Sequence, residues 1–297
     1  MTEERLKPVE EQSLSARQYG RVFDKVAAEY DRSRWTYPDK LVDRACEVGE
    51  IGSGDRVVEV GCGTGQLTRS LVARGLHVTA VEPGTHLIAL AKQKLEGPGE
   101  VEFVNAQFED AGLPAEHFRA VFSASAFHWI DPDVSWQKAA RVLLPGGTLA
   151  LLQHCGLREQ HGMRDEEELL SALAKVAPEI AAGWPPSMDL DTIVAGVEQR
   201  RENISEVWAW IGSYDVARDH ASRLFCDVQF AAVPTVVEHT ADELNAVIRT
   251  TSFYARLSPD QRQALESEYI AIHERLGRPI RSGTAAILVT ARRSIAV

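Results

Sequence analysis

Three glycines and one acid near residue 60 have types and spacing that suit a nucleotide-like ligand. The stretch from Val57 to Leu71, VVEVGCGTGQLTRSL, leads from strand-like residues into glycines at 61, 63 and 65 and then into an amphipathic helical pattern. Glycines at such a turn let the backbone approach a ligand that a Cβ atom would exclude. Glu59 lies two residues before Gly61, where a carboxylate repels a pyrophosphate but tolerates an amino group or a sulfonium. The motif therefore favours a cationic ligand without phosphate.

A second acid, Glu82, ends the next apolar run, 17 positions after Gly65. An acid at that place can accept hydrogen bonds from both hydroxyls of a ribose. Because the same acid occurs in NAD sites and in S-adenosylmethionine (SAM) sites, it indicates adenosine and leaves the cofactor open. The dinucleotide fingerprint has the form GxGxxG, and here Gln66 takes the last position. An NAD(P)-dependent oxidoreductase is thus disfavoured but stays an alternative.

Alternating strand and helix patterns place these residues in a sheet. Strands are expected at 55–60, 77–81, 101–106, 119–125 and 147–152, with helical patterns at 64–75, 85–95 and 132–143. Nearly all-apolar strands separated by helices predict an α/β protein with a parallel, doubly wound, Rossmann-like sheet. Ligands of such sheets bind beyond the carboxyl ends of the strands. The strand ends are at Gly61–Gly65, Glu82, Ala106–Glu109, Ser125–Trp129 and His154–Cys155.

The patterns divide the chain into four segments. We expect a helical cap at 1–54, a cofactor-binding core at 55–152, a helical insertion at 153–228 and completing strands and helices at 229–297. The insertion interrupts the alternation and contains Trp184, Trp208 and Trp210. These side chains either form a small core of their own or make the apolar wall of a substrate lid.

Composition narrows the class of partner. The formal net charge of −11 opposes binding to a phosphate backbone, so nucleic acid is not expected. The sequence has no run of about 18 apolar residues, so no membrane span is expected. The polar N-terminus lacks the apolar region of a secretory signal, and a cytoplasmic location is therefore expected. The four cysteines are far apart and lack zinc spacing, which predicts free thiols and no metal site. They are Cys46, Cys62, Cys155 and Cys226.

The form ExGCGTGxLT at 59–68, together with Glu82 and LLPGGTLALL at 143–152, resembles the class I SAM-dependent methyltransferases. The resemblance extends over about 30–152. FSASAFHWID at 122–131 and VFDKVAAEYDRSRWTYP at 22–38 resemble the trans-aconitate-methyltransferase-like branch, whose members act on small molecules. The resemblance implies a seven-stranded sheet in the order 3-2-1-4-5-7-6 with an antiparallel last strand. It also implies methyl transfer from SAM, with S-adenosylhomocysteine as product, to a small-molecule acceptor by a monomer or homodimer.

The resemblance further implies which residues contact the cofactor. They are Tyr30, Arg34, Glu59, Gly61, Cys62, Gly63, Gly65, Glu82, Pro83, Gln107, Phe108, Ser123, Ala124 and Ser125. Gln107 departs from relatives that carry an acid there, although its carbonyl can still accept from an adenine amino group. The residues expected at the acceptor are Tyr37, His128, Trp129, Cys155, Trp184 and Trp208.

His128 is the candidate catalytic residue because it follows a strand end. An imidazole that titrates near neutrality suits a general base if the acceptor must lose a proton. Its other readings are a pocket wall, a cofactor contact or a core residue. Two other functions would keep the same cofactor residues: a SAM-dependent cyclisation or rearrangement, and a non-catalytic SAM-binding module. The sequence does not identify the acceptor or the attacked atom.

Overall fold

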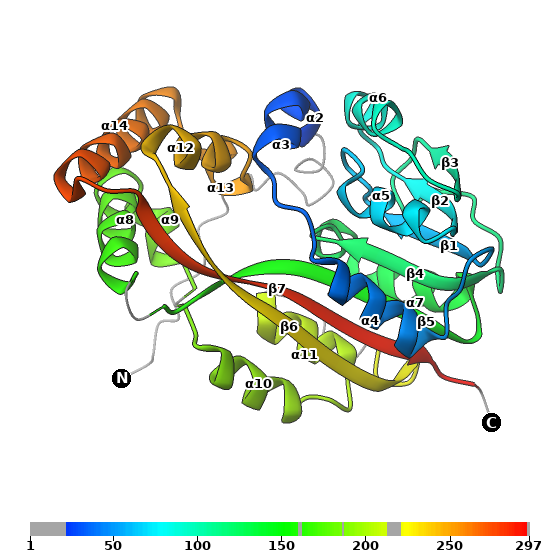
Figure 1. Ribbon diagram of the computed structural model, residues 1–297. Helices are drawn as coiled ribbons and strands as arrows, with labels where there is room; N and C mark the ends of the chain where they lie inside the picture. The colour runs from blue at the N-terminus through cyan, green and yellow to red at the C-terminus, as the bar shows by residue number, and fades with distance from the viewer. Residues whose placement is uncertain (1–21, 160–161, 186, 213–220, 296–297) are drawn as a thin grey trace, which may run out of the picture.

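The computed structural model describes residues 22–159, 162–185, 187–212 and 221–295, and its centre is a seven-stranded sheet (Figure 1). The strands have the order β3-β2-β1-β4-β5-β7-β6. Strands β1 to β5 pair in parallel, and β7 is antiparallel to both of its neighbours, β5 and β6. The predicted doubly wound sheet, its order and its antiparallel last strand are confirmed. The strands are β1 (Arg56–Val60), β2 (His77–Val81), β3 (Glu100–Val104), β4 (Phe118–Ala124), β5 (Leu143–Leu157), β6 (Phe225–His239) and β7 (Ile280–Arg293).

Helices connect the strands and extend beyond one end of the sheet (Figure 1). In the first half they are α2 (Val22–Lys25), α3 (Ala27–Ser33), α4 (Asp39–Gly49), α5 (Gln66–Ala73), α6 (Thr85–Gln93), the 3-10 helix η1 (Phe127–Trp129) and α7 (Pro132–Val142). In the second half they are α8 (Met163–Val176), α9 (Pro178–Ala182), α10 (Leu190–Glu198), α11 (Ile204–Gly212), α12 (Ala241–Arg249), α13 (Ser252–Arg256) and α14 (Pro259–Leu276).

Two hydrophobic layers, one on each face, hold the sheet in place. Successive side chains of a strand point to opposite faces, so Val121 joins Trp136 of α7 on one face and Phe122 joins Leu71 of α5 on the other. All four of these side chains are at most 1% exposed. Burying an apolar side chain of this size contributes about 1.5–3 kcal/mol. The two layers therefore fix the carboxyl ends of the strands, where the glycine turn lies.

A third cluster lies beyond the ends of the long strands, where α8 and α9 pack on α12 and α14. This cluster contains α8 and α9, the first half of the expected insertion. The second half, α10 and α11, packs on the face of the sheet that α7 also covers, away from the third cluster (Figure 1). The insertion is also shorter than the expected 153–228, because β5 continues to Leu157 and β6 begins at Phe225. Its helices thus belong to two separate clusters rather than to one lid.

Trp208 is a core residue, which corrects its expected place at the acceptor. Its side chain is fully buried in the layer that contains Val207 and Ile211 of the same helix. The recurrence of apolar residues at helical spacing in α11 gives this helix a core-facing side, and Trp208 lies on it. Residues 1–21 of the expected cap, and 160–161, 186 and 213–220 of the insertion, lie outside the described residues.

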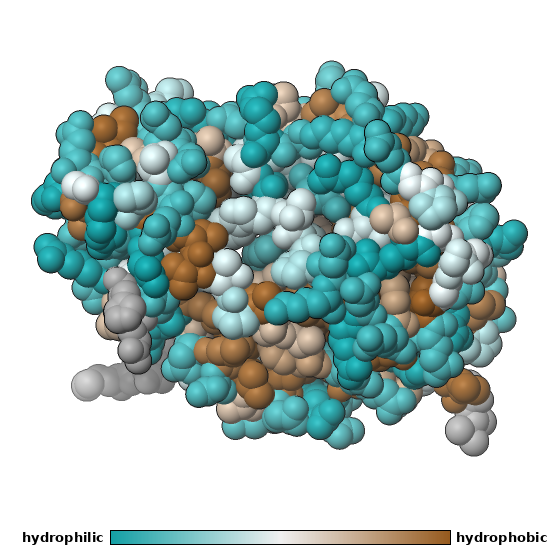
Figure 2. Space-filling view, viewed as in Figure 1, coloured by the Kyte–Doolittle hydropathy of each residue, from teal (hydrophilic) through white to brown (hydrophobic). Residues whose placement is uncertain are grey.

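The described residues give three further findings. No helix in the described part of the chain is both long and apolar enough to cross a membrane. Within the described ranges, no three His, Cys, Asp or Glu side chains gather as they would around a metal ion. In Figure 2 the visible face is mostly hydrophilic, and apolar residues form separate patches on it.

Candidate functional site

Two adjoining cavities open at the carboxyl ends of the strands. The first, of about 310 Å³, extends from Glu82 at the end of β2 to His128 and is called the β2 cavity. The second, of about 420 Å³, lies beside His154–Gly156 of β5 and is called the β5 cavity. Their linings have eight residues in common. These are Tyr30, Arg34, Gly61, Gly63, Ala124, Ser125, His154 and Thr251.

The glycine turn separates the two cavities and is shaped by close contact. Gly61 has a φ of 71°, and a Cβ atom on it would lie 2.3 Å from the Cβ of Ala126. The next glycine of the turn, Gly63, donates its N–H to Glu82 at 3.0 Å, and Gly84 donates to the other carboxylate oxygen at 2.8 Å. Both oxygens of Glu82 keep a second lone pair. Glu82 is therefore oriented for the ribose contact that its place in the sequence suggests, and burial raises the pKa of its carboxyl group.

Glu59 and Gln66 present unsatisfied polar atoms in the β5 cavity. One carboxyl oxygen of Glu59 accepts from the Thr68 hydroxyl at 2.6 Å, whereas Oε1 has no partner among the described residues. Burial raises the pKa of Glu59 to about 8, against the opposing effect of the Thr68 hydrogen bond. Nε2 of Gln66 is likewise buried without a partner in the described chain. An orphaned acceptor and an orphaned donor in one cavity fit the ammonium and carboxylate of an amino acid, the part of SAM that carries the sulfonium.

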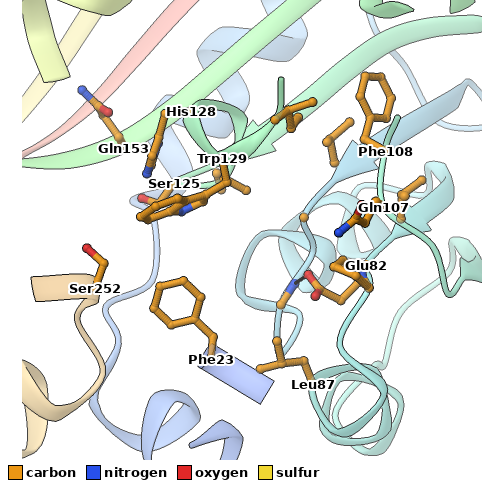
Figure 3. Close-up of a pocket in the computed structure, with 18 of the residues that line it drawn as sticks. Phe23, Glu82, Leu87, Gln107, Phe108, Ser125, His128, Trp129, Gln153 and Ser252 are labelled. Atoms are coloured by element: carbon orange, nitrogen blue, oxygen red, sulfur yellow. Dashed lines mark hydrogen bonds between the residues drawn. The ribbon is translucent and has the colours of Figure 1, made fainter. Parts of the chain in front are cut away.

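The predicted adenine contacts lie at the Glu82 end of the β2 cavity. Phe108 and Gln107 lie beside Glu82 in Figure 3. Behind them, Nζ of Lys138 donates to the carbonyl groups of Glu109 at 2.9 Å and Ala111 at 2.6 Å. The same ammonium group lies 5.2 Å from the centroid of the Phe108 ring. Lys138 thus holds the loop that carries both predicted adenine contacts, and the sequence alone gave no signal for it.

The helical cap closes the β2 cavity from the N-terminal side. Phe23 of α2 makes edge contacts with Tyr30 at 5.7 Å and with Trp129 at 5.9 Å between ring centroids, and Figure 3 shows it facing Trp129 across the cavity. The guanidinium of Arg34 lies 5.0 Å from the centroid of the Tyr30 ring and donates to Thr250 Oγ1 at 3.1 Å.

Helix α3 carries ion pairs to both sides of the cleft. Asp31 pairs with Lys94, which follows α6, and Glu29 pairs with Arg249 of α12 at 3.5 Å. The cap is therefore attached to the sheet side through α6 and to the C-terminal helices through α12.

His128 lies in η1 and faces the β2 cavity, beside Trp129 and Gln153 (Figure 3). Burial lowers the pKa of its imidazole to about 3. This value lies well below the expected titration near neutrality, because burial disfavours the charged form of the ring. The catalytic role of His128 stays a prediction. His128 does not line the β5 cavity.

Aromatic side chains form one part of the wall of the β5 cavity. The ring of His154 stacks on Tyr37 at 4.8 Å and meets Trp35 edge-on at 5.3 Å between centroids. The Tyr37 hydroxyl lies 2.7 Å from Oγ of Ser125, a non-glycine residue with a φ of 52° at the end of β4. Trp184 lines the same cavity.

The structure brings most of the predicted residues together. Of the predicted cofactor residues, all but Gly65 and Ser123 line one of the two cavities. Gly65 instead caps α5 with a φ of 85°, and the buried Ser123 hydroxyl donates to the Val60 carbonyl at 2.9 Å. Of the acceptor residues, Tyr37, Cys155 and Trp184 line the β5 cavity, whereas His128 and Trp129 line only the β2 cavity.

Several lining residues were not anticipated. They are Phe23, Trp35, Gln66, Leu87, Gln153, His154, Val247, Thr251, Ser252 and Ser282–Thr284. The positions of His154 and Gln153 near the end of an apolar strand could have predicted them as site residues. No sequence pattern predicts Val247, Thr251 or the residues of β7, because they reach the site only through the packing of the C-terminal helices and strand.

The sheet order, the glycine turn and the strand-end acid define a Rossmann-like domain that binds an adenosine-containing cofactor. Residues 58–151 match the family model described as a methyltransferase domain. The match covers about a third of the chain, and this part is similar to methyltransferase domains.

Curated relatives match over about half of the chain. An uncharacterized methyltransferase of Mycobacterium tuberculosis is 35% identical over 140 residues, which cover 47% of this chain and 55% of the relative. A demethylmenaquinone methyltransferase of Clavibacter sepedonicus is 29% identical over 142 residues, covering 46% and 58%. The chain spans about half the length of these curated relatives.

Solved structures share the fold over nearly the whole chain. A putative type II methyltransferase from Anaeromyxobacter dehalogenans has a TM-score of 0.54 at 22% identity and covers 89% of this chain and 99% of its own. The [4+2]-cyclase SpnF has a TM-score of 0.52 at 15% identity, covering 95% and 98%. At these identities the likeness concerns the fold alone.

Proposed function

We propose that the protein transfers a methyl group from SAM, which would extend from the β2 cavity to Glu59 and Gln66, to a small-molecule acceptor in the part of the β5 cavity beside His154 and Trp184. The observation that carries this proposal is the wall that the two cavities share, which contains Gly61, Gly63, Ala124 and Ser125. A cofactor that passes along this wall would lie next to an acceptor in the rest of the β5 cavity. Holding two reactants in contact supplies much of the rate enhancement of a displacement reaction.

The residues present fit the cofactor along its length. Gln107 and Phe108 would hold the adenine, Glu82 the ribose, and Glu59 with Gln66 the amino-acid end. When bound, the cofactor supplies a methyl group on an electrophilic sulfonium. The chain's own contribution is to orient the donor, to enclose it under α2 and α3, and to leave one side of the shared wall open to the acceptor.

The oxidoreductase alternative fits the cavities less well. Among the described lining residues, three acids, Glu59, Glu82 and Glu109, stand against one Lys or Arg side chain, that of Arg34, so a dinucleotide pyrophosphate would meet more acidic than basic groups. A non-catalytic SAM-binding module would use the same cofactor residues and stays an alternative. A cyclisation or rearrangement would use the same two cavities and stays an alternative. Membership of the trans-aconitate-methyltransferase-like branch, the cytoplasmic location and the monomeric or homodimeric state also remain predictions.

The test begins with binding and ends with turnover. Mass spectrometry of ligand released from the purified chain, followed by calorimetric titration with S-adenosylhomocysteine, should reveal a single site. An acceptor screen that detects S-adenosylhomocysteine formation then identifies methylated products by their added mass of one CH₂ unit. A chain that neither retains nor binds SAM or S-adenosylhomocysteine would refute the proposal. Release of a product without the added mass would favour the cyclisation or rearrangement.

A further inference from the structure

Thr68 of α5 contacts the acid that we assign to the ammonium group of the cofactor. Its hydroxyl group lies 2.6 Å from Oε2 of Glu59, and both side chains are at most 1% exposed. An ionised carboxylate can only accept hydrogen bonds, so with this form of Glu59 the Thr68 hydroxyl is the donor. Thr68 lines neither cavity, so it reaches a ligand through Glu59 rather than by contact.

The contact leaves one oxygen of Glu59 for a ligand. The backbone of Glu59 pairs with β2 on one side and β4 on the other, so the side-chain torsions decide where the two oxygens face. Oε2 is taken by Thr68, Oε1 has no partner among the described residues, and Glu59 lines the β5 cavity. Gln66, in the same first turn of α5, also lines this cavity. The turn thus carries one residue for the carboxylate of an amino acid and one that orients the acid for its ammonium group.

The charged form of Glu59 depends on the same contact. Burial and the nearby Glu82 carboxyl group both raise the pKa of Glu59, and the hydrogen bond from Thr68 lowers it. Burial raises the pKa values of Tyr30, Cys62 and Cys155 and lowers that of His154, so these four side chains of the cavity are neutral from pH 6 to 8. The remaining ionisable side chains that line it are Arg34 and Tyr37.

We propose that Thr68 is a positioning residue for the cofactor: its hydroxyl group holds one carboxylate oxygen of Glu59 and directs the other to the ligand's ammonium group. This inference rests on the proposed function and adds a residue that does not contact the cofactor. The ammonium group and the Thr68 hydroxyl favour the same ionised form of Glu59. Loss of the hydroxyl should therefore weaken binding most at a pH where Glu59 of the ligand-free chain is protonated.

The experiment measures binding of S-adenosylhomocysteine to the full chain by calorimetry. Thr68→Val removes the hydroxyl group but keeps the shape of the side chain, whereas Thr68→Ser keeps the hydroxyl group. At pH 7 we expect Thr68→Val to bind about tenfold more weakly than the wild type, the lower end for a hydrogen bond to a charged group. Thr68→Ser should stay close to the wild type, and the loss in Thr68→Val should shrink above pH 8.

The number of protons released on binding separates positioning from a loss of packing. With the pKa of Glu59 at about 8, binding to the wild type at pH 8 should release about half a proton. Without the hydrogen bond from Thr68 that pKa rises further, so Thr68→Val should release closer to one proton at pH 8. Thr68→Ala, measured beside it, should release the same number. A residue that only fills space would change the affinity without changing this number.

Two further variants complete the design. Thr148 of β5 is fully buried, its hydroxyl group has no partner in the described part of the chain, and it lines neither cavity. Thr148→Val is therefore the matched control and should change neither the affinity nor the proton release. In the Glu59→Gln background, Thr68→Val should have a much smaller effect on affinity, because residues that act through one contact are not additive.

Three results would overturn the inference: unchanged affinity and proton release in both Thr68→Val and Thr68→Ala, an equal loss in Thr68→Val and Thr68→Ser, or the same loss from Thr68→Val with and without Glu59→Gln. Each of them requires that the wild type binds S-adenosylhomocysteine. Failure of the wild type to bind it would instead refute the proposed function, so the two failures are distinguishable.

Discussion

The buried carboxyl group of Glu59 should make cofactor binding release a proton. Its pKa of about 8 keeps the group mostly neutral at pH 7, because burial disfavours the carboxylate. A ligand ammonium placed at the orphaned Oε1 favours the ionised form instead. Each pH unit below 8 then costs about 1.4 kcal/mol of binding free energy. The affinity for S-adenosylhomocysteine should therefore rise about tenfold per pH unit from pH 6 to 8 and level off where the ligand's own amino group begins to lose its proton.

The variant Glu59→Gln removes the titration and the charge while keeping the size of the side chain. A hydrogen bond to a charged group contributes about 1.5–3 kcal/mol, so the variant should bind about 10- to 150-fold more weakly at pH 8. The difference from the wild type should shrink towards pH 6, where the wild-type carboxyl is also protonated. Calorimetry in buffers of different ionisation enthalpy measures the released proton directly: close to one for the wild type at pH 6 to 7 and close to none for Glu59→Gln.

The same group should affect the stability of the ligand-free chain in the opposite direction. Because the folded pKa is raised above the ordinary 4.5, the folded chain holds the proton more tightly than the unfolded chain. The stability that this proton contributes is complete below pH 4.5 and is lost as the pH rises towards 8. Glu59→Gln should therefore melt like the wild type at pH 5 and at a higher temperature at pH 8. The control is Glu100→Gln, which removes an exposed acid on β3. A wild-type affinity that does not change between pH 6 and 8 would refute the reasoning.

Three other substitutions test separate parts of the site. Gly61→Ala places a Cβ atom 2.3 Å from Ala126 at a φ of 71° and should abolish S-adenosylhomocysteine binding in a chain whose circular dichroism stays native; measurable binding would show that the turn can yield. Lys138→Met keeps the apolar stem but frees the carbonyl groups of Glu109 and Ala111, so KM for SAM should rise with little change in kcat, and an unchanged KM would remove Lys138 from the site. Trp208→Ala should cost about 3–5 kcal/mol in denaturant unfolding while the folded chain keeps its S-adenosylhomocysteine affinity, and a selective loss of acceptor affinity would restore Trp208 to the substrate site.

Local patterns predicted the parts of the site that are local in the chain. The glycine turn, Glu59 and Glu82 follow strands whose apolar runs mark them clearly, so both the elements and the strand ends could be read from the sequence. Trp208 could not be placed, because helical spacing shows that a helix has an apolar side but not which surface that side meets. Val247 and Thr251 could not be found at all, since they reach the cleft through the third hydrophobic cluster, which forms between segments far apart in the chain.

The electrostatic environment of the histidines was equally hidden from the sequence. His128 follows a strand end, as a catalytic residue does in many α/β proteins, and this position made it the candidate base. Burial of the ring determines its pKa. Phe127 and Trp129 lie on either side of it in the 3-10 helix η1, which the sequence did not predict. The place of His154 near the end of β5 could be read from the sequence, whereas the burial that lowers its pKa could not.

Two ion pairs of α3 hold the cap over the mouth of the cleft. The Asp31–Lys94 pair connects it to the sheet side, and the Glu29–Arg249 pair connects it to α12. The four side chains are 11% to 39% exposed. Partly exposed pairs weaken as salt shortens the Debye length, which is about 10 Å at 0.1 M and 3 Å at 1 M. We expect release of S-adenosylhomocysteine to require one of these pairs to open, so that its exit quickens with ionic strength while the buried contacts inside the cavity hardly change. The residence time of the product would then depend on charges that do not contact it.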